Sequence, residues 1–154
     1  MSVRPLNILL ADDDMDDCLF FNEALEEMAV STQLSAVHDG EQLMQLLNDE
    51  TQKLPDILFL DINMPRKNGF ECLTEIKQNK KLNHFPIVIF STSFEQEVVN
   101  RLYNSGAHFF IRKPSEFALF KKIILHTLTL LMPGYISKPS KENFVISMES
   151  SLSI

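Results

Sequence analysis

The sequence predicts an α/β domain with a central parallel sheet, because apolar runs of strand length alternate with helical patterns five times. The chain has 154 residues, a length that suits one domain with a core of its own. Two of the apolar runs end directly in acidic residues, at Asp12 and at Asp61. A short, wholly apolar run is typical of a strand that is buried on both faces. We therefore expect a flavodoxin-like, doubly wound (βα)5 fold with a five-stranded parallel sheet.

The first two strand–helix units are expected in the N-terminal third of the chain. The first strand covers Leu6–Ala11, and in the helix after it Asp14 takes the N-cap and Asp17 the acidic third position. A weaker strand over Gln33–His38 precedes Asp39-Gly40 and the second helix. The apolar residues at helical spacing in these two helices are Cys18, Phe21, Leu25, Met28, Leu43, Leu46 and Leu47.

The third and fourth units follow two prolines. Pro55 breaks the chain ahead of a strand over Asp56–Leu60, and a loop with Pro65 and Gly69 then leads into the third helix. The fourth strand covers Ile87–Phe90 and directly follows Pro86. The apolar residues of the third and fourth helices are Phe70, Leu73, Ile76, Val98 and Leu102.

The fifth unit completes the domain. Gly106 stands where a left-handed cap would end the fourth helix, and the fifth strand covers Ala107–Ile111. The last helix begins near Ser115 and carries Phe117, Phe120, Ile124 and Leu128 at helical spacing. The domain is expected over residues 1–132, and Pro133-Gly134 ends the regular pattern.

Residues 133–154 have two interpretations. They are rich in Ser and Lys, which favours a partly ordered tail. They also contain the apolar stretch Asn143–Met148, which suits an added strand that covers a sheet edge or reaches a partner chain. We favour the tail and keep the strand as the alternative.

The composition excludes several classes of function. A formal net charge of −7 disfavours general nucleic-acid binding, which needs clustered Lys and Arg. Cys18 and Cys72 have no metal-ligand neighbours and are expected to be small buried hydrophobes in a reducing compartment. The run Leu6–Ala11 is too short for a signal peptide, and no apolar stretch approaches the length of a membrane span. We expect a cytoplasmic protein that binds neither nucleic acid nor a membrane.

Acidic, hydroxyl and basic side chains stand at the carboxyl ends of four expected strands. Asp12 and Asp13 follow the first strand, Asp61 the third, Ser91 the fourth and Lys113 the fifth. Ligands of open α/β sheets bind beyond these ends, so the five side chains should meet. Crowded carboxylates repel one another, and Mg²⁺ relieves that repulsion through oxygen ligands. A carboxylate can accept a phosphoryl group, and a lysine beside the metal can neutralise its charge.

These residues resemble the receiver domain of two-component response regulators. The resemblance extends over Leu6 to Met132 and rests on five separated sites in the family's order, which is more specific than any single motif. The residues that carry it are Asp12-Asp13, Asp61, Ser91, Phe110 and Lys113-Pro114.

The resemblance implies a role for each acidic residue. Asp61 would accept a phosphoryl group from the phosphohistidine of a sensor kinase or a phosphotransfer protein. Asp13 and Asp61 would bind Mg²⁺ directly together with the backbone carbonyl of Asn63, and Asp12 would act through a metal-bound water. Lys113 would pair with the phosphoryl oxygens.

The resemblance also implies a switch. The Ser91 hydroxyl and the backbone N–H groups of Asn63 and Thr92 would hold the phosphoryl oxygens. Ser91 would move toward the phosphoryl group and the Phe110 ring would repack, which biases the face of the fourth helix, fifth strand and fifth helix between two states. Thr92 departs from the family, in which Ala or Gly is common. Our hypothesis is that it slows the entry of small phosphodonors and of water.

The acidic run from Asp12 also allows simpler interpretations. For Asp14, Asp16 and Asp17 we favour an acid-rich helix N-terminus, which the helix dipole stabilises. The run imitates a calcium loop that ends at Glu23, but Asp17 stands where the turn requires Gly, and a strand rather than a helix precedes it.

Two other function classes compete with a receiver. A phosphatase of the haloacid dehalogenase type needs a second Asp two residues after its nucleophile, and this chain has Asn63 there. A phosphorylation-independent scaffold on the same fold is the main alternative, although degenerate receivers usually lose one or more site residues. The site residues that are intact here are Asp12, Asp13, Asp61, Ser91 and Lys113.

We therefore expect a stand-alone, Mg²⁺-dependent response regulator receiver rather than an enzyme. Its partners would be a sensor histidine kinase or phosphotransfer protein and a downstream protein target. The resemblance allows a homodimer through the face of the fourth helix, fifth strand and fifth helix. Kinase docking in the family uses the first helix, so Met15, Cys18 and Leu19 are contact candidates.

Overall fold

The computed structural model describes residues 5–28, 31–92, 95–131 and 139–146. Its strands are β1 (Leu6–Ala11), β2 (Thr32–Val37), β3 (Ile57–Leu60), β4 (Ile87–Ser91), β5 (Phe109–Arg112) and β6 (Val145–Ile146). Its helices are α1 (Met15–Glu26), α2 (Gly40–Asn48), α3 (Gly69–Gln78), α4 (Gln96–Asn104) and α5 (Phe117–Leu131), with a 3₁₀ turn, η1, at Lys141–Asn143.

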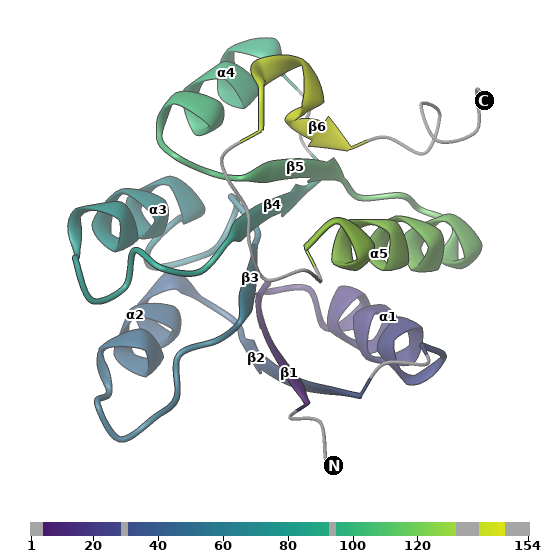
Figure 1. Cartoon of the computed structure of the whole chain (residues 1–154), viewed down its shortest axis with the longest axis horizontal. Helices are drawn as coiled ribbons and strands as arrows, with labels where there is room; N and C mark the ends of the chain where they lie inside the picture. The colour runs from purple at the N-terminus through teal and green to yellow at the C-terminus, as the bar shows by residue number, and fades with distance from the viewer. Residues whose placement is uncertain (1–4, 29–30, 93–94, 132–138, 147–154) are drawn as a thin grey trace.

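In the described part of the chain the strands form one parallel sheet in the order β2-β1-β3-β4-β5-β6. Helices α1 and α5 cover one face, and α2, α3 and α4 cover the other (Figure 1). The expected doubly wound fold is confirmed, because the five strand–helix units follow one another in the predicted order.

The central strands are apolar throughout because helices bury both of their faces. Every residue of β3 and β4 is buried, as are the last four residues of β1. Under α1 and α5, four phenylalanine rings meet edge to face, with the Phe21 and Phe59 centroids 4.8 Å apart and those of Phe90 and Phe120 5.3 Å apart. Each such pair stabilises the core by about 1 kcal/mol beyond burial alone.

Side-chain caps fix where α1, α2 and α3 begin, and at α2 the Asp39 side chain accepts from the Gln42 N–H. Asp14 accepts from the backbone N–H groups of Asp16 and Asp17 at the start of α1, as expected. Asn68 and Glu71 form a capping box at the start of α3. Gly69, expected in the preceding loop, is therefore the first residue of the helix.

Strands β2 to β5 differ from the prediction by one or two residues at one or both ends. The fifth strand begins at Phe109 rather than Ala107, because the Ala107 N–H donates to Leu102 O and closes the turn after α4. Gly106 has φ of 100° in that turn, which confirms the expected left-handed cap. The second strand stops at Val37, and the backbone N–H of His38 donates to Gln42 Oε1.

The sheet has a sixth strand where five were expected. Strand β6 lies parallel to β5, with Phe110 opposite Val145 and Ile111 opposite Ile146. Residues 145–146 thus follow the alternative interpretation, a strand that covers an edge, and a two-residue strand is too short to give a periodic signal. The expected boundary between residues 132 and 133 lies outside the described residues.

Among the described residues, no helix is long and apolar enough to cross a membrane.

Candidate functional site

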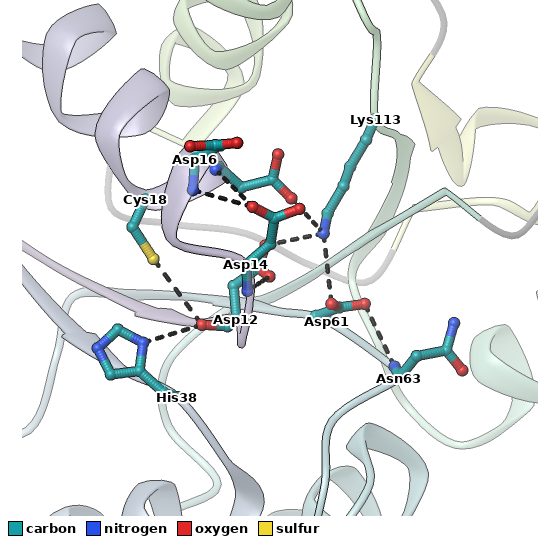
Figure 2. Close-up of polar contacts among 9 residues, drawn as sticks. Asp12, Asp14, Asp16, Cys18, His38, Asp61, Asn63 and Lys113 are labelled. Carbon is teal, nitrogen blue, oxygen red and sulfur yellow. Dashed lines mark hydrogen bonds and ion pairs between the residues drawn. The ribbon is translucent and has the colours of Figure 1, made fainter.

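The predicted site residues gather at the carboxyl ends of the central strands. Ala11 pairs with Leu60 in the β1–β3 register, and the Asp61 N–H donates to Ala11 O at 2.9 Å. This register puts Asp12 and Asp61 side by side directly after their strands. Lys113 reaches the same place from the end of β5 (Figure 2).

Three carboxylates converge there. Oxygen atoms of Asp12, Asp13 and Asp61 all lie within 4.8 Å of one another. Asp12 is 0% and Asp61 5% exposed, whereas Asp13 is open to solvent. Burial raises the pKa of Asp12 to about 7, although Lys113 opposes the shift. Burial also raises the pKa of Asp61, again against the effect of Lys113.

Lys113 carries the positive charge of this cluster. Its Nζ lies 2.8 Å from Asp12 Oδ2, 2.8 Å from Asp17 Oδ2 and 3.3 Å from Asp61 Oδ2, with the lysine side chain only 7% exposed. Burial alone would lower the pKa of Lys113, but its close contacts with the carboxylates of Asp12 and Asp17 and the charge of Asp61 raise it above its usual value. The lysine is therefore a permanent cation shared by three carboxylates.

The carboxylates fit a hard divalent cation. Oδ2 of Asp12 is fully buried, and its only partner among the described residues is the ion-pair contact with Lys113, which lacks good hydrogen-bond geometry. It therefore keeps acceptor capacity that water or a cation can use. Three carboxylates within reach of one ion, two of them buried, match the all-oxygen ligands that Mg²⁺ prefers.

Short-range contacts hold the two buried acids in place. Asp61 Oδ1 accepts from the Asn63 N–H at 3.2 Å, and Asp12 Oδ1 accepts from the Asp14 N–H at 3.0 Å. The backbone carbonyl of Asp12 lies 3.1 Å from His38 Nδ1 and 3.8 Å from Cys18 Sγ (Figure 2). Cys18 is thus a packing residue whose thiol pKa burial raises to about 11.

The remaining predicted residues belong to β4 and β5 or follow them. Ser91 is buried at the end of β4, where its carbonyl accepts from the Lys113 N–H at 2.9 Å. Thr92 follows it and is exposed. Phe110 is fully buried in β5, so the structure places it in the core, on the strand that pairs with the strand of Ser91.

Sequence reasoning missed the contact of Asp17 with this site. Asp17 was assigned to the helix N-terminus, yet its carboxylate is an ion-pair partner of Lys113. Side chains of a helix tilt toward its N-terminus, and the N-terminus of α1 lies at the carboxyl ends of the strands. This geometry could have indicated that Asp17 reaches the site. His38 contacts the backbone carbonyl of Asp12 rather than a carboxylate of the cluster.

Comparisons with known proteins point to one family. The model of the response regulator receiver domain matches residues 8–125. Response regulator Rcp1 of Synechocystis is 32% identical over 124 residues, which cover 77% of this chain and 84% of Rcp1. The probable methanogenesis regulatory protein FilR2 of Methanothrix harundinacea is 25% identical over 123 residues, covering 78% of this chain and 79% of FilR2.

Solved structures agree with these sequence matches. The phosphorylated cyanobacterial phytochrome response regulator RcpA superposes with a TM-score of 0.81 at 28% identity, covering 89% of this chain and 100% of RcpA. The Mn²⁺-bound form of Rcp1 gives 0.77 at 27% identity, covering 88% of this chain and 100% of that structure.

Proposed function

Because the chain belongs to the response regulator receiver family, we propose that it is a stand-alone receiver that accepts a phosphoryl group on Asp61. The reaction is Mg²⁺-dependent, and the signal leaves through protein contacts. The observation that carries the proposal is the buried ammonium of Lys113, held 3.3 Å from Asp61 Oδ2 at the edge of a carboxylate cluster.

The proposed reaction is a transfer between two side chains. A carboxylate oxygen of Asp61 forms a bond to phosphorus as the phosphorus–nitrogen bond of a phosphohistidine breaks, and the leaving imidazole keeps the electron pair and takes a proton. Lys113 stabilises the negative charge on the phosphoryl oxygens, and it stays protonated because its pKa is raised. The backbone of Asn63 already faces the carboxylate of Asp61.

Asp13, Asp61 and the backbone carbonyl of Asn63 are the proposed direct ligands of Mg²⁺, and Asp12 acts through a bound water. When bound, the cation lowers the repulsion between the carboxylates and the incoming phosphoryl group. The carboxylate cluster supports this assignment. A relative, Rcp1, has been solved in a Mn²⁺-bound form.

The switch is assigned to Ser91, Thr92 and Phe110. In the proposal the Ser91 hydroxyl and the Thr92 N–H bind phosphoryl oxygens, and the buried Phe110 ring repacks in response. Phe110 has no hydroxyl, so its readout rests on packing alone.

The proposed phosphodonor is a sensor histidine kinase or a phosphotransfer protein in the cytoplasm. On α1, beside the site, Met15 is 60% and Leu19 58% exposed, and these two apolar side chains one helical turn apart offer a docking partner a surface to cover. The proposed receiver spans residues 1–132, and the face of α4, β5 and α5 is the proposed route to a downstream protein or a second copy.

Intact-protein mass after incubation with phosphoramidate and Mg²⁺ tests the proposal. We expect the gain of one phosphoryl group, lost in Asp61→Asn and in EDTA but kept in the control Asp16→Asn, which removes an exposed acid. No gain in the wild type, together with no binding of beryllofluoride, would instead support a phosphorylation-independent scaffold.

A further inference from the structure

We propose that Asp17 is a positioning residue that keeps Lys113 at the phosphoryl site while a divalent cation occupies the carboxylate cluster. The inference rests on the proposed function and deepens it, since it assigns a role to a residue outside the predicted site.

Asp17 lies as close to the Lys113 ammonium as Asp12 does. Both carboxylates lie 2.8 Å from Lys113 Nζ, closer than Asp61 at 3.3 Å. The Asp17 side chain is 18% exposed and that of Lys113 is 7% exposed, so solvent screens their attraction only weakly.

The three partners of Lys113 differ in what a cation does to them. Asp12 and Asp61 belong to the cluster that can hold the ion, and Asp17 does not. A bound divalent cation neutralises Asp12 and Asp61 and repels the lysine ammonium. Asp17 then remains as the carboxylate that holds Lys113 in reach of Asp61.

Asp17 is itself held rigidly, as a positioning residue must be. It is the third residue of α1, and its N–H donates to the capping carboxylate of Asp14 at 3.3 Å. Helix α1 is fixed to the sheet through buried residues such as Phe21 and packs along α5. The backbone of Asp17 is therefore fixed by the helix cap and by the packing of α1.

The test compares Asp17→Asn with Asp16→Asn, because each removes one negative charge from neighbouring positions of α1. Phosphorylation by phosphoramidate is measured with saturating Mg²⁺, and the dissociation constant of beryllofluoride by ¹⁹F NMR. We expect Asp17→Asn to slow phosphorylation and weaken beryllofluoride binding about tenfold. Asp16→Asn should stay near the wild type, and Asp17→Glu should recover part of the loss.

A double-mutant cycle separates positioning from a general structural effect. In the Lys113→Ala background, Asp17→Asn should no longer change beryllofluoride affinity, because its partner is gone. An equal loss in both backgrounds, or equal effects of Asp17→Asn and Asp16→Asn, overturns the inference. If the wild type neither gains a phosphoryl group nor binds beryllofluoride, the proposed function itself has failed.

A second inference comes from a separate part of the molecule. Resting likewise on the proposed function, we infer that the C-terminal segment, residues 139–146, is bound to β5 more tightly in the unphosphorylated protein than in the phosphorylated one.

The segment contacts the proposed switch residue directly. The Phe110 N–H donates to Phe144 O at 2.9 Å, and the two rings lie 6.5 Å apart. The Phe144 ring, 1% exposed, also packs 5.2 Å from that of Tyr103 on α4. Tyr103 in turn donates its hydroxyl hydrogen bond to Pro139 O at 3.1 Å.

Strand β5 connects these contacts to the site. Phe110 lies three residues before Lys113, whose N–H is bonded to the Ser91 carbonyl. Phe110 is fully buried beneath the segment, so its ring cannot repack without disturbing Phe144. The contacts fit one arrangement of β5, and a shift of Lys113 and Ser91 toward a phosphoryl group weakens them.

Amide hydrogen exchange at Phe110 tests this second inference. With beryllofluoride and Mg²⁺ we expect the Phe110 N–H to exchange at least about tenfold faster, while the Phe59 N–H in β3 does not change. By linkage, Phe144→Ala and the milder Tyr103→Phe should bind beryllofluoride more tightly, unlike the control Leu34→Ala in β2 at the opposite edge of the sheet. Unchanged exchange at Phe110 in a protein that binds beryllofluoride overturns the inference.

Discussion

The side chains of Lys113 and Asp12 form a buried ion pair, with Nζ and Oδ2 2.8 Å apart and exposed fractions of 7% and 0%. Removing water from two charges costs free energy that only close pairing offsets. Because Asp17 and Asp61 share the same ammonium, the site carries more negative than positive charge. The fold therefore holds these carboxylates close together at a cost that a cation can lower.

Loss of the lysine charge should destabilise the metal-free protein. Lys113→Met leaves the buried carboxylates without a counter-ion, and we expect the free energy of unfolding to fall by about 3 kcal/mol. Urea denaturation in EDTA measures this. The control Lys121→Met breaks a solvent-exposed pair with Glu27 and should cost at most about 1 kcal/mol. Equal effects of the two variants would contradict the importance of the buried pair.

The stability of the metal-free protein should fall as pH rises. The pKa of Asp12 is about 7 in the folded protein, above its ordinary value of 3.8, so the carboxyl favours folding most when it is protonated. This contribution is complete below pH 3.8 and is lost as pH rises through 7.

Between pH 5 and 8 the loss should be on the order of 2–3 kcal/mol, measured by denaturation in EDTA. Asp12→Asn, which cannot ionise, should show a flatter profile. Protons compete with the cation for the same oxygens, so Mg²⁺ affinity should rise over this pH range. A wild-type profile parallel to that of Asp12→Asn would show that Asp12 does not titrate there.

A methyl group at Gly69 should disturb Asp61. A Cβ atom there would lie 2.4 Å from the Asp61 carbonyl oxygen and 2.7 Å from Ile62 Cα, both backbone atoms. We expect Gly69→Ala to cost about 1–3 kcal/mol in stability and to slow phosphorylation. Thr74→Ala, at an exposed position of the same helix, is the control and should change neither quantity appreciably. Normal phosphorylation of Gly69→Ala would show that the backbone of Asp61 and Ile62 can move aside without disturbing the site.

Thr92→Ala should shorten the lifetime of the phosphorylated protein. Thr92 is exposed directly after the buried Ser91, where its β-branched side chain can limit the approach of water to the acyl phosphate. We expect hydrolysis about fivefold faster, which corresponds to about 1 kcal/mol in the barrier. The decay of the phosphorylated mass measures it, with Thr129→Ala as the control. An unchanged decay rate would remove the hypothesis.

Much of the site could be predicted because short-range pattern and topology place it together. Buried strands are recognisable in the sequence as continuous apolar runs, and Asp12 and Asp61 directly follow two of them. Parallel strands then bring their carboxyl ends to one edge of the sheet. The convergence of Asp12, Asp13 and Asp61 with Lys113 follows from these two facts.

The contacts that were missed depend on distances between segments far apart in the chain. In the sequence, nothing around Asp17 distinguishes it from an acid that only stabilises the start of a helix. In the structure its carboxylate lies 2.8 Å from the ammonium of Lys113, which follows β5. The strand of Val145–Ile146 follows only the alternative interpretation of the sequence, because two residues give no periodic pattern. It forms where β5 offers an edge and the Phe144 ring packs against Tyr103.

The sequence by itself determined the sheet, the order of its units and the residues at its strand ends, because periodicity and turn residues act between near neighbours. Only the tertiary structure decided which carboxylates share Lys113 and what covers Phe110. Ion pairing and burial depend on the distance and solvent exposure of groups that only the folded chain brings together.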